Sequence, residues 1–173
     1  MTAAVRQRFN DSTIQRFNLT IANRQRARPV NLRFLRRIAH TLLVELLPTR
    51  KLDLGVCLVA GPEITRLNVT FLHHQGQTDV IAFNYDKSRK PHTLHGEILI
   101  CVDEAVSQAR RFRTTWQSEL ARYIIHGVLH LRGHDDLRSA DRRKMKREEN
   151  RLLKEIARRF SLSKLDSKPK LST

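Results

Sequence analysis

The segment from Thr114 to Gly133 constrains the fold more than any other part of the sequence. Its large apolar residues recur at helical spacing: Leu120, Ile124, Val128 and Leu131. Thr114 or Thr115 is suited to cap the start of this helix, and a glycine suits the left-handed residue that ends one. Apolar residues surround the two histidines in its second half, which indicates a largely buried, central helix.

The rest of the chain predicts an α+β fold with one sheet covered by helices. Strand-like runs occupy residues 16–23, 52–60, 80–85 and 94–102. Helical patterns occupy residues 32–47, 63–73, 103–111 and 139–160. We therefore expect residues 1–160 to form a single domain. Residues 161–173 are rich in Ser, Lys and Pro, and we expect them to form a flexible basic tail.

Charge and composition favour an anionic partner. The net charge of +16 favours RNA, DNA or an anionic surface, and a basic surface without such a partner is the alternative. Many of the cations crowd residues 138–159, and others lie within residues 86–91. No apolar run is long enough to span a bilayer, and no secretory signal is recognisable. We therefore expect a cytoplasmic protein without a membrane partner.

Two histidines of the central helix form a candidate metal site. His126 and His130 lie four residues apart, so a helix places both imidazoles on one face, close enough to share one ion. Burying both without a shared partner would be costly. A turn at Gly133 can then bring back Asp136 as the third ligand, and His134 is the competing third ligand. Two histidines and a carboxylate leave a position for water, which is the pattern of a catalytic rather than a structural zinc.

The residue after the first histidine bears on the kind of hydrolase. Zinc metalloproteases with the His-Glu-x-x-His motif carry their general base at this position, but this chain has Gly127. The water would therefore be activated by the metal itself or by a group from elsewhere in the chain. A metalloprotease-like hydrolase remains the alternative interpretation of the histidine spacing.

Four motifs occur in a fixed order along the chain. Leu67-Asn68 comes first, Thr78–Phe83 and Gly96–Ile100 follow, and His126–Asp136 comes last. In this order they resemble the Leu-Asn pair, the Thr-Asp-Val-Leu-Ser-Phe strand, the Gly-Asp-Ile-x-Ile strand and the histidine signature of the YbeY family of rRNA maturation factors. The joint match covers most of residues 52–136.

The resemblance implies a mixed sheet of about four strands with helices around it. It also implies a zinc-dependent, single-strand-specific endoribonuclease, with one Zn²⁺ as cofactor and ribosomal RNA and the ribosome as partners. The family acts in ribosomal RNA maturation, including processing of the small-subunit rRNA 3′ end, and in ribosome quality control. A non-catalytic, ribosome-associated RNA-binding factor with a structural zinc is the alternative from another class.

Two departures from the family pattern concern the chemistry. The family commonly has a third histidine where this chain has Asp136, and it often has an arginine where this chain has Leu72. Either a neighbouring cation takes the role of that arginine or the activity is altered. The sequence therefore assigns no general acid or base beyond a metal-bound water, and the candidate side chains are His73, His74 and His134.

Overall fold

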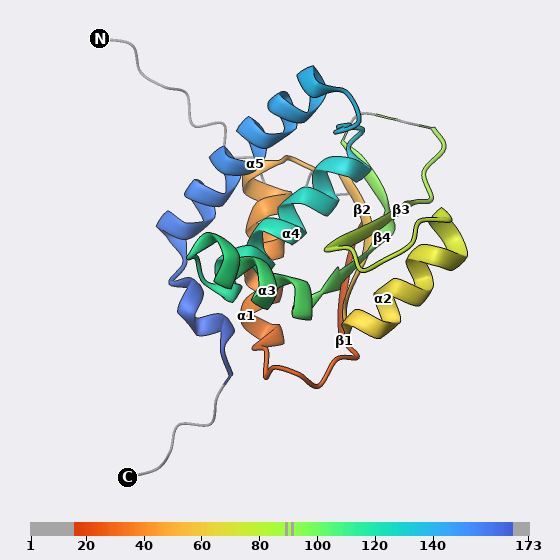
Figure 1. The fold of residues 1–173 in the computed structure, drawn as a ribbon. Coiled ribbons are helices and arrows are strands. Elements are labelled where there is room, and N and C mark those ends of the chain that lie inside the picture. The colour runs from red at the N-terminus through yellow and green to blue at the C-terminus, as the bar shows by residue number, and fades with distance from the viewer. Residues whose placement is uncertain (1–15, 89, 91, 168–173) are drawn as a thin grey trace.

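The computed structural model describes residues 16–88, 90 and 92–167, which form one sheet with helices on both faces (Figure 1). The strands are β1 Arg16–Asn23, β2 Lys51–Val59, β3 Val80–Asn84 and β4 Thr93–Cys101. The α-helices are α1 Leu32–Thr41, α2 Gly61–Leu67, α3 Val102–Phe112, α4 Trp116–Leu131 and α5 Ser139–Arg159. Short π-helical turns extend α1 and α2 over Leu42–Leu46 and Asn68–Leu72. Every strand and helix predicted from the sequence is present.

The sheet is mixed, as the resemblance implied. Its strand order is β1-β2-β4-β3, with β1, β2 and β4 parallel and β3 antiparallel to β4. Parallel strands need a crossover connection, and α1 supplies it between β1 and β2. β3 and β4 are neighbours in sequence and pair through a short connection, which is how antiparallel strands are commonly joined.

Alternate residues of the two central strands face two separate apolar layers. The larger layer joins one face of the sheet to α1, α3, α4 and α5, and its strand residues include Leu54, Val56, Ile98 and Ile100. The smaller layer joins the other face to α2 through Cys57, Val59, Ile64, Leu99 and Cys101. Figure 1 shows α4 lying across the sheet on the side opposite α2. The helix that carries the two histidines is therefore packed directly on the sheet.

Gly127 sets how closely α4 approaches the sheet. A Cβ atom at this position would lie 2.6 Å from Cγ2 of Ile98 on β4, closer than packed atoms come. The position after His126 therefore faces the sheet and has no room for a side chain. It cannot hold the general base that a metalloprotease of the His-Glu-x-x-His type carries there, so the geometry disfavours that alternative.

The two ends of α4 follow the predicted capping. The Thr115 hydroxyl accepts a hydrogen bond from the Ser118 backbone N–H at 3.2 Å. Gly133 has a φ of 89°, in the region that favours glycine, and the His134 N–H donates to the Leu129 carbonyl at 3.0 Å. This closure reverses the chain direction directly after the second histidine.

The sequence predicted a flexible tail over residues 161–173, but its first residues are ordered against the core. Leu162–Leu165 form a 3₁₀ turn, Leu165 is fully buried, and its carbonyl accepts from the Asn31 N–H at 2.8 Å. Two leucines three residues apart are enough to dock this turn against the core, although the surrounding composition is polar. Residues 168–173 of the tail and residues 1–15 of the predicted domain lie outside the described residues.

None of the helices in the described ranges has the length and apolar character needed to cross a membrane. The two cysteines, Cys57 and Cys101, are buried free thiols within the smaller apolar layer.

We expect Gly127→Ala to lower the free energy of unfolding by about 1–3 kcal/mol, because the added methyl group overpacks the contact with Ile98. In an exposed helix the same change would be stabilising. Chemical denaturation measures the effect. In an Ile98→Ala background the loss should shrink, and an equal loss in both backgrounds would show that the contact is not responsible.

Candidate metal centre

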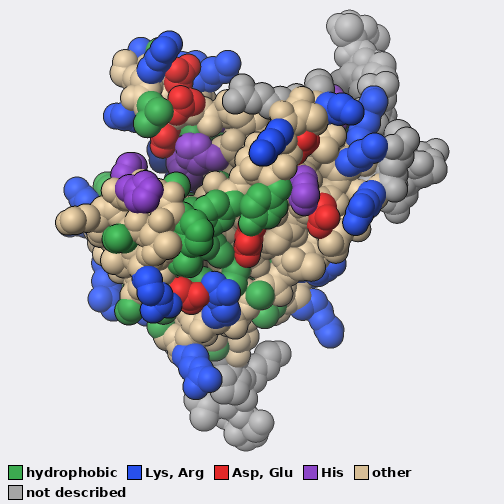
Figure 2. Space-filling model, turned by 90° about the vertical axis from the view of Figure 1, so that its right-hand side faces the viewer, with side chains coloured by type: hydrophobic (Ala, Val, Ile, Leu, Met, Phe, Trp, Pro, Cys, Tyr) green, Lys and Arg blue, Asp and Glu red, His purple; other side chains and the backbone are tan. Residues whose placement is uncertain are grey.

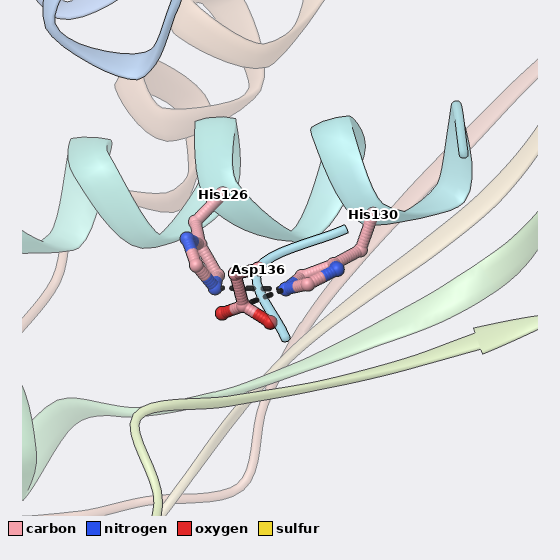
Figure 3. Close-up of side chains that lie close together, drawn as sticks. All are labelled: His126, His130 and Asp136. Atoms are coloured by element: carbon pink, nitrogen blue, oxygen red, sulfur yellow. Dashed lines mark hydrogen bonds and ion pairs between the residues drawn. The ribbon is translucent and has the colours of Figure 1, made fainter. Parts of the chain in front are cut away.

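One face of α4 brings the two imidazoles together. The Nε2 atoms of His126 and His130 lie 3.0 Å apart, and the ring centroids are separated by 4.6 Å. Both side chains are half-buried, because α4 is packed between the sheet and α5. The spacing of four residues predicted this pair, and Figure 3 shows the two rings pointing toward one another.

The turn after α4 carries Asp136 to the same point. Its Oδ2 atom lies 3.8 Å from Nε2 of His130, and one ligand atom from each of the three residues lies within 4.8 Å of the others. Figure 3 shows the carboxylate beside the two rings. The structure thus brings Asp136, and not the competing His134 side chain, to the two histidines.

The other nitrogen of each imidazole faces an acceptor. Nδ1 of His126 lies 3.0 Å from a carboxylate oxygen of Glu149, and Nδ1 of His130 lies 3.1 Å from the His134 carbonyl. A carboxylate and a carbonyl can only accept, so these partners assign the proton of each neutral ring to Nδ1. Both Nε2 atoms then turn lone pairs toward each other and toward Asp136. A cation between them satisfies all three groups, and two imidazoles with one carboxylate suit a divalent transition metal.

Glu149 of α5 holds His126 in this orientation. Its side chain is almost fully buried, with the residue 3% exposed, and it accepts from Arg122 at 2.7 Å, Lys146 at 2.9 Å and His126 at 3.0 Å. Burial disfavours the charged carboxylate, but these donors outweigh burial and lower the pKa of Glu149 to about 2. The hydrogen-bonded carboxylate therefore stays ionised.

The two histidines are tuned in opposite directions. Burial lowers the pKa of His126, but the hydrogen bond that His126 donates to Glu149 and the nearby carboxylates outweigh burial, so the net shift of the pKa is upward. Burial and the neighbouring His126 together lower the pKa of His130. In the absence of a metal ion, the pair therefore favours a proton on His126.

Sequence reasoning missed Glu149, although a signal for it exists. Glu149 occupies the buried stripe of α5 together with Met145, Leu152 and Ile156, at spacings of three and four residues. An acid inside the apolar stripe of an otherwise charged helix needs a buried partner. The crowding of cations on α5 masked this position.

A cleft of about 780 Å³ opens beside the three residues. α3, α4, α5 and the segment before β3 line it, and His126, Asp136 and Glu149 form part of its wall. The candidate metal centre therefore has space for a substrate group on one side. Pockets of this size accept small organic groups.

The weaker candidates from the sequence do not join the site. His73, with a φ of 55°, ends the π-helical turn after α2 and His74 follows it; both are exposed and lie apart from the cleft wall. The His134 side chain lines a separate pocket of about 360 Å³ with Arg132 and Lys144. None of the three therefore has a place at the point where the ligand atoms converge.

Leu72 lies in an apolar and exposed part of the surface. It shares this exposure with Val69 and Phe71 of the same turn, and Phe71 packs edge-on against Phe83 with ring centroids 5.6 Å apart. Figure 2 shows a face on which hydrophobic side chains are exposed near histidines, with lysine and arginine side chains around its edge. No cation stands at the position where the resemblance places an arginine.

Fold and site together define an α+β protein whose central helix carries a candidate metal centre open to a cleft. A family model described as Endoribonuclease YbeY matches residues 20–157. This match covers well over half of the chain, and the chain belongs to the YbeY endoribonuclease family.

Curated proteins named Endoribonuclease YbeY are similar to this chain over part of its length. The protein of Chlorobium luteolum is 41% identical over 93 residues, which cover 54% of this chain and 66% of the relative. The protein of Elusimicrobium minutum is 34% identical over 110 residues, covering 62% and 77%, respectively. The protein of Myxococcus xanthus is 38% identical over 127 residues, covering 71% of this chain and 42% of that longer relative.

A solved structure shares the fold. The solution structure of TM1509 from Thermotoga maritima superimposes with a TM-score of 0.60 at 25% sequence identity, and the match covers 89% of this chain and 99% of that one. At this coverage and TM-score, the two chains share the same overall arrangement of sheet and helices.

We expect Glu149→Gln to weaken the affinity for a divalent ion by about 10–100-fold, because a neutral amide holds the His126 tautomer less firmly than a carboxylate. Competition with a chromophoric chelator, with Zn²⁺ as the probe ion, measures the affinity. Glu148→Gln is the matched control, because Glu148 is the neighbouring acid of α5 and pairs with Arg151 instead. Thermal unfolding of both metal-free variants checks that the fold survives, and equal affinity in both would contradict the role of Glu149.

Proposed function

We propose that this chain is a zinc-dependent endoribonuclease that cuts single-stranded regions of ribosomal RNA. The observation that carries the proposal is the convergence of two imidazole Nε2 atoms and the Asp136 carboxylate beside an open cleft. Membership of the YbeY endoribonuclease family supports the reaction type. The finer role, in small-subunit rRNA 3′-end maturation and ribosome quality control in the cytoplasm, follows from the family resemblance and is part of the proposal.

His126, His130 and Asp136 would hold the ion, with Glu149 and the His134 carbonyl orienting the two rings. When bound, Zn²⁺ supplies a Lewis acid that lowers the pKa of water and polarises a phosphodiester oxygen. The three protein ligands leave a coordination position for the reacting groups. The chain itself orients these ligands and provides the cleft in which the RNA strand lies.

Arg142 is the cation suited to contact the scissile phosphate. It lines the cleft beside Asp136, and its guanidinium donates only to backbone carbonyls, those of Asp136 at 3.0 Å and Leu137 at 3.5 Å. The other cations of the cleft, Arg122 and Lys146, are bound to Glu149. Arg142 thus keeps an uncompensated charge among the described residues of the cleft, and guanidinium groups suit phosphate.

The charges of α5 support a path for the RNA backbone. Its first half carries cations without a carboxylate partner in the described ranges: Arg142, Arg143, Lys144 and Arg147. In its second half, Arg151, Arg158 and Arg159 form ion pairs with Glu148, Glu155 and Glu45, and Lys154 is the one cation there without a carboxylate partner among the described residues. The free cations are therefore concentrated at the end of α5 next to the metal centre, where they favour phosphate binding.

We expect His130→Ala and Asp136→Ala each to lose bound zinc and to lower RNA cleavage by roughly 100-fold or more, because two ligands cannot retain the ion. Metal analysis and cleavage of a single-stranded RNA measure both effects. His134→Ala is the control and should keep its zinc, because only the backbone of His134 contacts the site.

The same experiment separates the alternative of a structural metal. A chain that binds zinc, loses thermal stability when the zinc is chelated and never cuts RNA would be an RNA-binding factor with a structural metal, and the proposal would fail.

We expect Arg142→Ala to lower kcat/KM for RNA cleavage by about 10–100-fold, which corresponds to the loss of a hydrogen bond to a charged group. Arg142→Lys should recover part of the loss, because the charge remains. Arg143→Ala removes the same charge from α5 without lining the cleft, so its effect should be smaller and confined to KM. If Arg142→Ala instead releases zinc, the residue serves to hold the Asp136 turn, and the phosphate contact is refuted.

A further inference from the structure

The wall of the cleft that α3 and the segment before β3 contribute, together with Tyr123 of α4, has its own chemistry. It combines an aromatic ring, carboxylates, amides and a phenol hydroxyl, from Gln77, Asp79, Glu104, Gln108, Phe112 and Tyr123. These residues come from three places in the sequence, the segment before β3, helix α3 and the first half of α4. The volume of about 780 Å³ is shared between this wall and the metal end.

The charge of this wall is opposite to that of the whole chain. The net charge is +16, yet this wall carries the carboxylates of Asp79 and Glu104, and no lysine or arginine is among the described residues that form it. Arg122 and Lys146 are neutralised by pairing with Glu119 and Glu149. Carboxylates repel phosphates, so the phosphate backbone is expected along the cations of α5, and this wall suits a neutral group that offers hydrogen-bond donors.

The orientation of Glu104 is fixed by its neighbours. Gln108 Nε2 donates to Oε1 at 2.6 Å and Gln77 Nε2 donates to Oε2 at 2.9 Å. Each carboxylate oxygen keeps a further acceptor site for a ligand. Phe112, at the end of α3, is 61% exposed and lines the cleft, and the Arg111 guanidinium lies 5.3 Å from its ring centroid, which leaves the opposite ring face for a ligand. A fixed acceptor beside an aromatic ring is what a flat heterocycle with N–H groups requires.

Tyr123 provides an independent sign that this wall binds a polar group. The residue is 4% exposed and lines the cleft, yet its hydroxyl has no hydrogen-bond partner among the described residues. A buried hydroxyl without a partner costs stability, and native structures almost always satisfy such groups. Burial and the nearby carboxylates of Asp79, Glu119 and Glu104 raise the pKa of Tyr123, so the hydroxyl keeps its proton and can donate.

We propose that this wall is a base-binding subsite, which takes one unpaired nucleobase of the RNA strand beside the scissile phosphate and prefers a base with an amino group. The proposal rests on the proposed ribonuclease function and adds a specificity to it. The Phe112 ring stacks on the base, Glu104 accepts from its amino group, and the Tyr123 hydroxyl donates to a ring nitrogen or carbonyl. Only an unpaired base can enter, which gives a physical reason for single-strand specificity.

The Glu104 carboxylate can discriminate among the four bases. Cytosine, adenine and guanine each carry an exocyclic amino group that a carboxylate can accept from. Uracil has no amino group, and its one donor on this edge, the ring N3–H, lies between two carbonyl oxygens that would meet the Glu104 carboxylate as acceptor against acceptor. The subsite therefore disfavours uridine at the position next to the cleaved bond.

Binding of short single strands of cytidine, adenosine or uridine to the full, zinc-loaded chain tests the subsite. Fluorescence anisotropy gives the Kd, and a gel confirms that the strands stay intact during the measurement. The wild type should bind cytidine and adenosine strands roughly fivefold or more tightly than the uridine strand. Glu104→Gln should shrink or reverse this ratio, because its amide can donate to uracil. Glu155→Gln, the same change at a partly exposed, ion-paired acid outside the cleft, should leave the ratio unchanged.

Two further variants separate binding from structure. Tyr123→Phe should keep or raise the melting temperature, because it removes an unsatisfied hydroxyl, and should weaken binding of the cytidine and adenosine strands. Phe112→Ala, at an exposed position, should weaken all three strands by a similar factor of roughly five or more, as loss of a stacking ring does.

Unchanged base ratios in both Glu104→Gln and Tyr123→Phe would overturn the subsite, whether or not the chain cuts RNA. Binding of a lysine-rich peptide that is lost in Glu104→Gln, without any base preference, would assign the acidic wall to a basic peptide and would also overturn it. A base preference that responds to these variants in a chain that never cuts RNA would support the subsite while refuting the proposed nuclease function. RNA cleavage without any base preference would support the nuclease function and refute the subsite.

Discussion

Burial of a helix that carries two histidines is the constraint on which the rest of this site depends. α4 lies between the sheet and α5, so both imidazoles are half-buried and their nitrogens have limited access to water. The Nδ1 atoms find partners in Glu149 and in the backbone carbonyl of the following turn. The Nε2 atoms are left facing one another and Asp136, and this arrangement calls for a cation. The candidate metal centre is thus a consequence of how the helix is buried.

The protein separates two kinds of charge that a nuclease needs. Free cations gather at the start of α5, whereas carboxylates line the cleft beneath it. The cations favour the phosphate backbone, and the carboxylates of the wall at α3 favour donor groups of bases. The net charge of +16 reflects the excess of cations, but it does not reveal the carboxylates of the cleft, because it is a sum over the whole chain.

Local patterns predicted most of the secondary structure, because hydrophobic periodicity reports which face of an element is buried. The four strands, the five helices, the threonine cap and the left-handed Gly133 all follow from such patterns. Such patterns failed where the burial of a few residues differs from that expected from the neighbouring sequence. Leu162 and Leu165 dock within a polar segment, and Glu149 is buried within a charged helix. In both cases the partner that explains the residue lies far away in sequence, on α1 or α4.

The sequence by itself determined that His126 and His130 share a helix face, that the helix ends at Gly133 and that Asp136 follows within reach, because a helical repeat and a turn are local geometry. It also carried the motifs that relate the chain to its family. Only the tertiary structure decided which nitrogen of each ring is free, why position 127 must be glycine and which residues form the cleft. Those features depend on contacts with Ile98, Glu149 and α3. These residues are distant in sequence from one another or from α4, and only the packing of the folded chain brings them together.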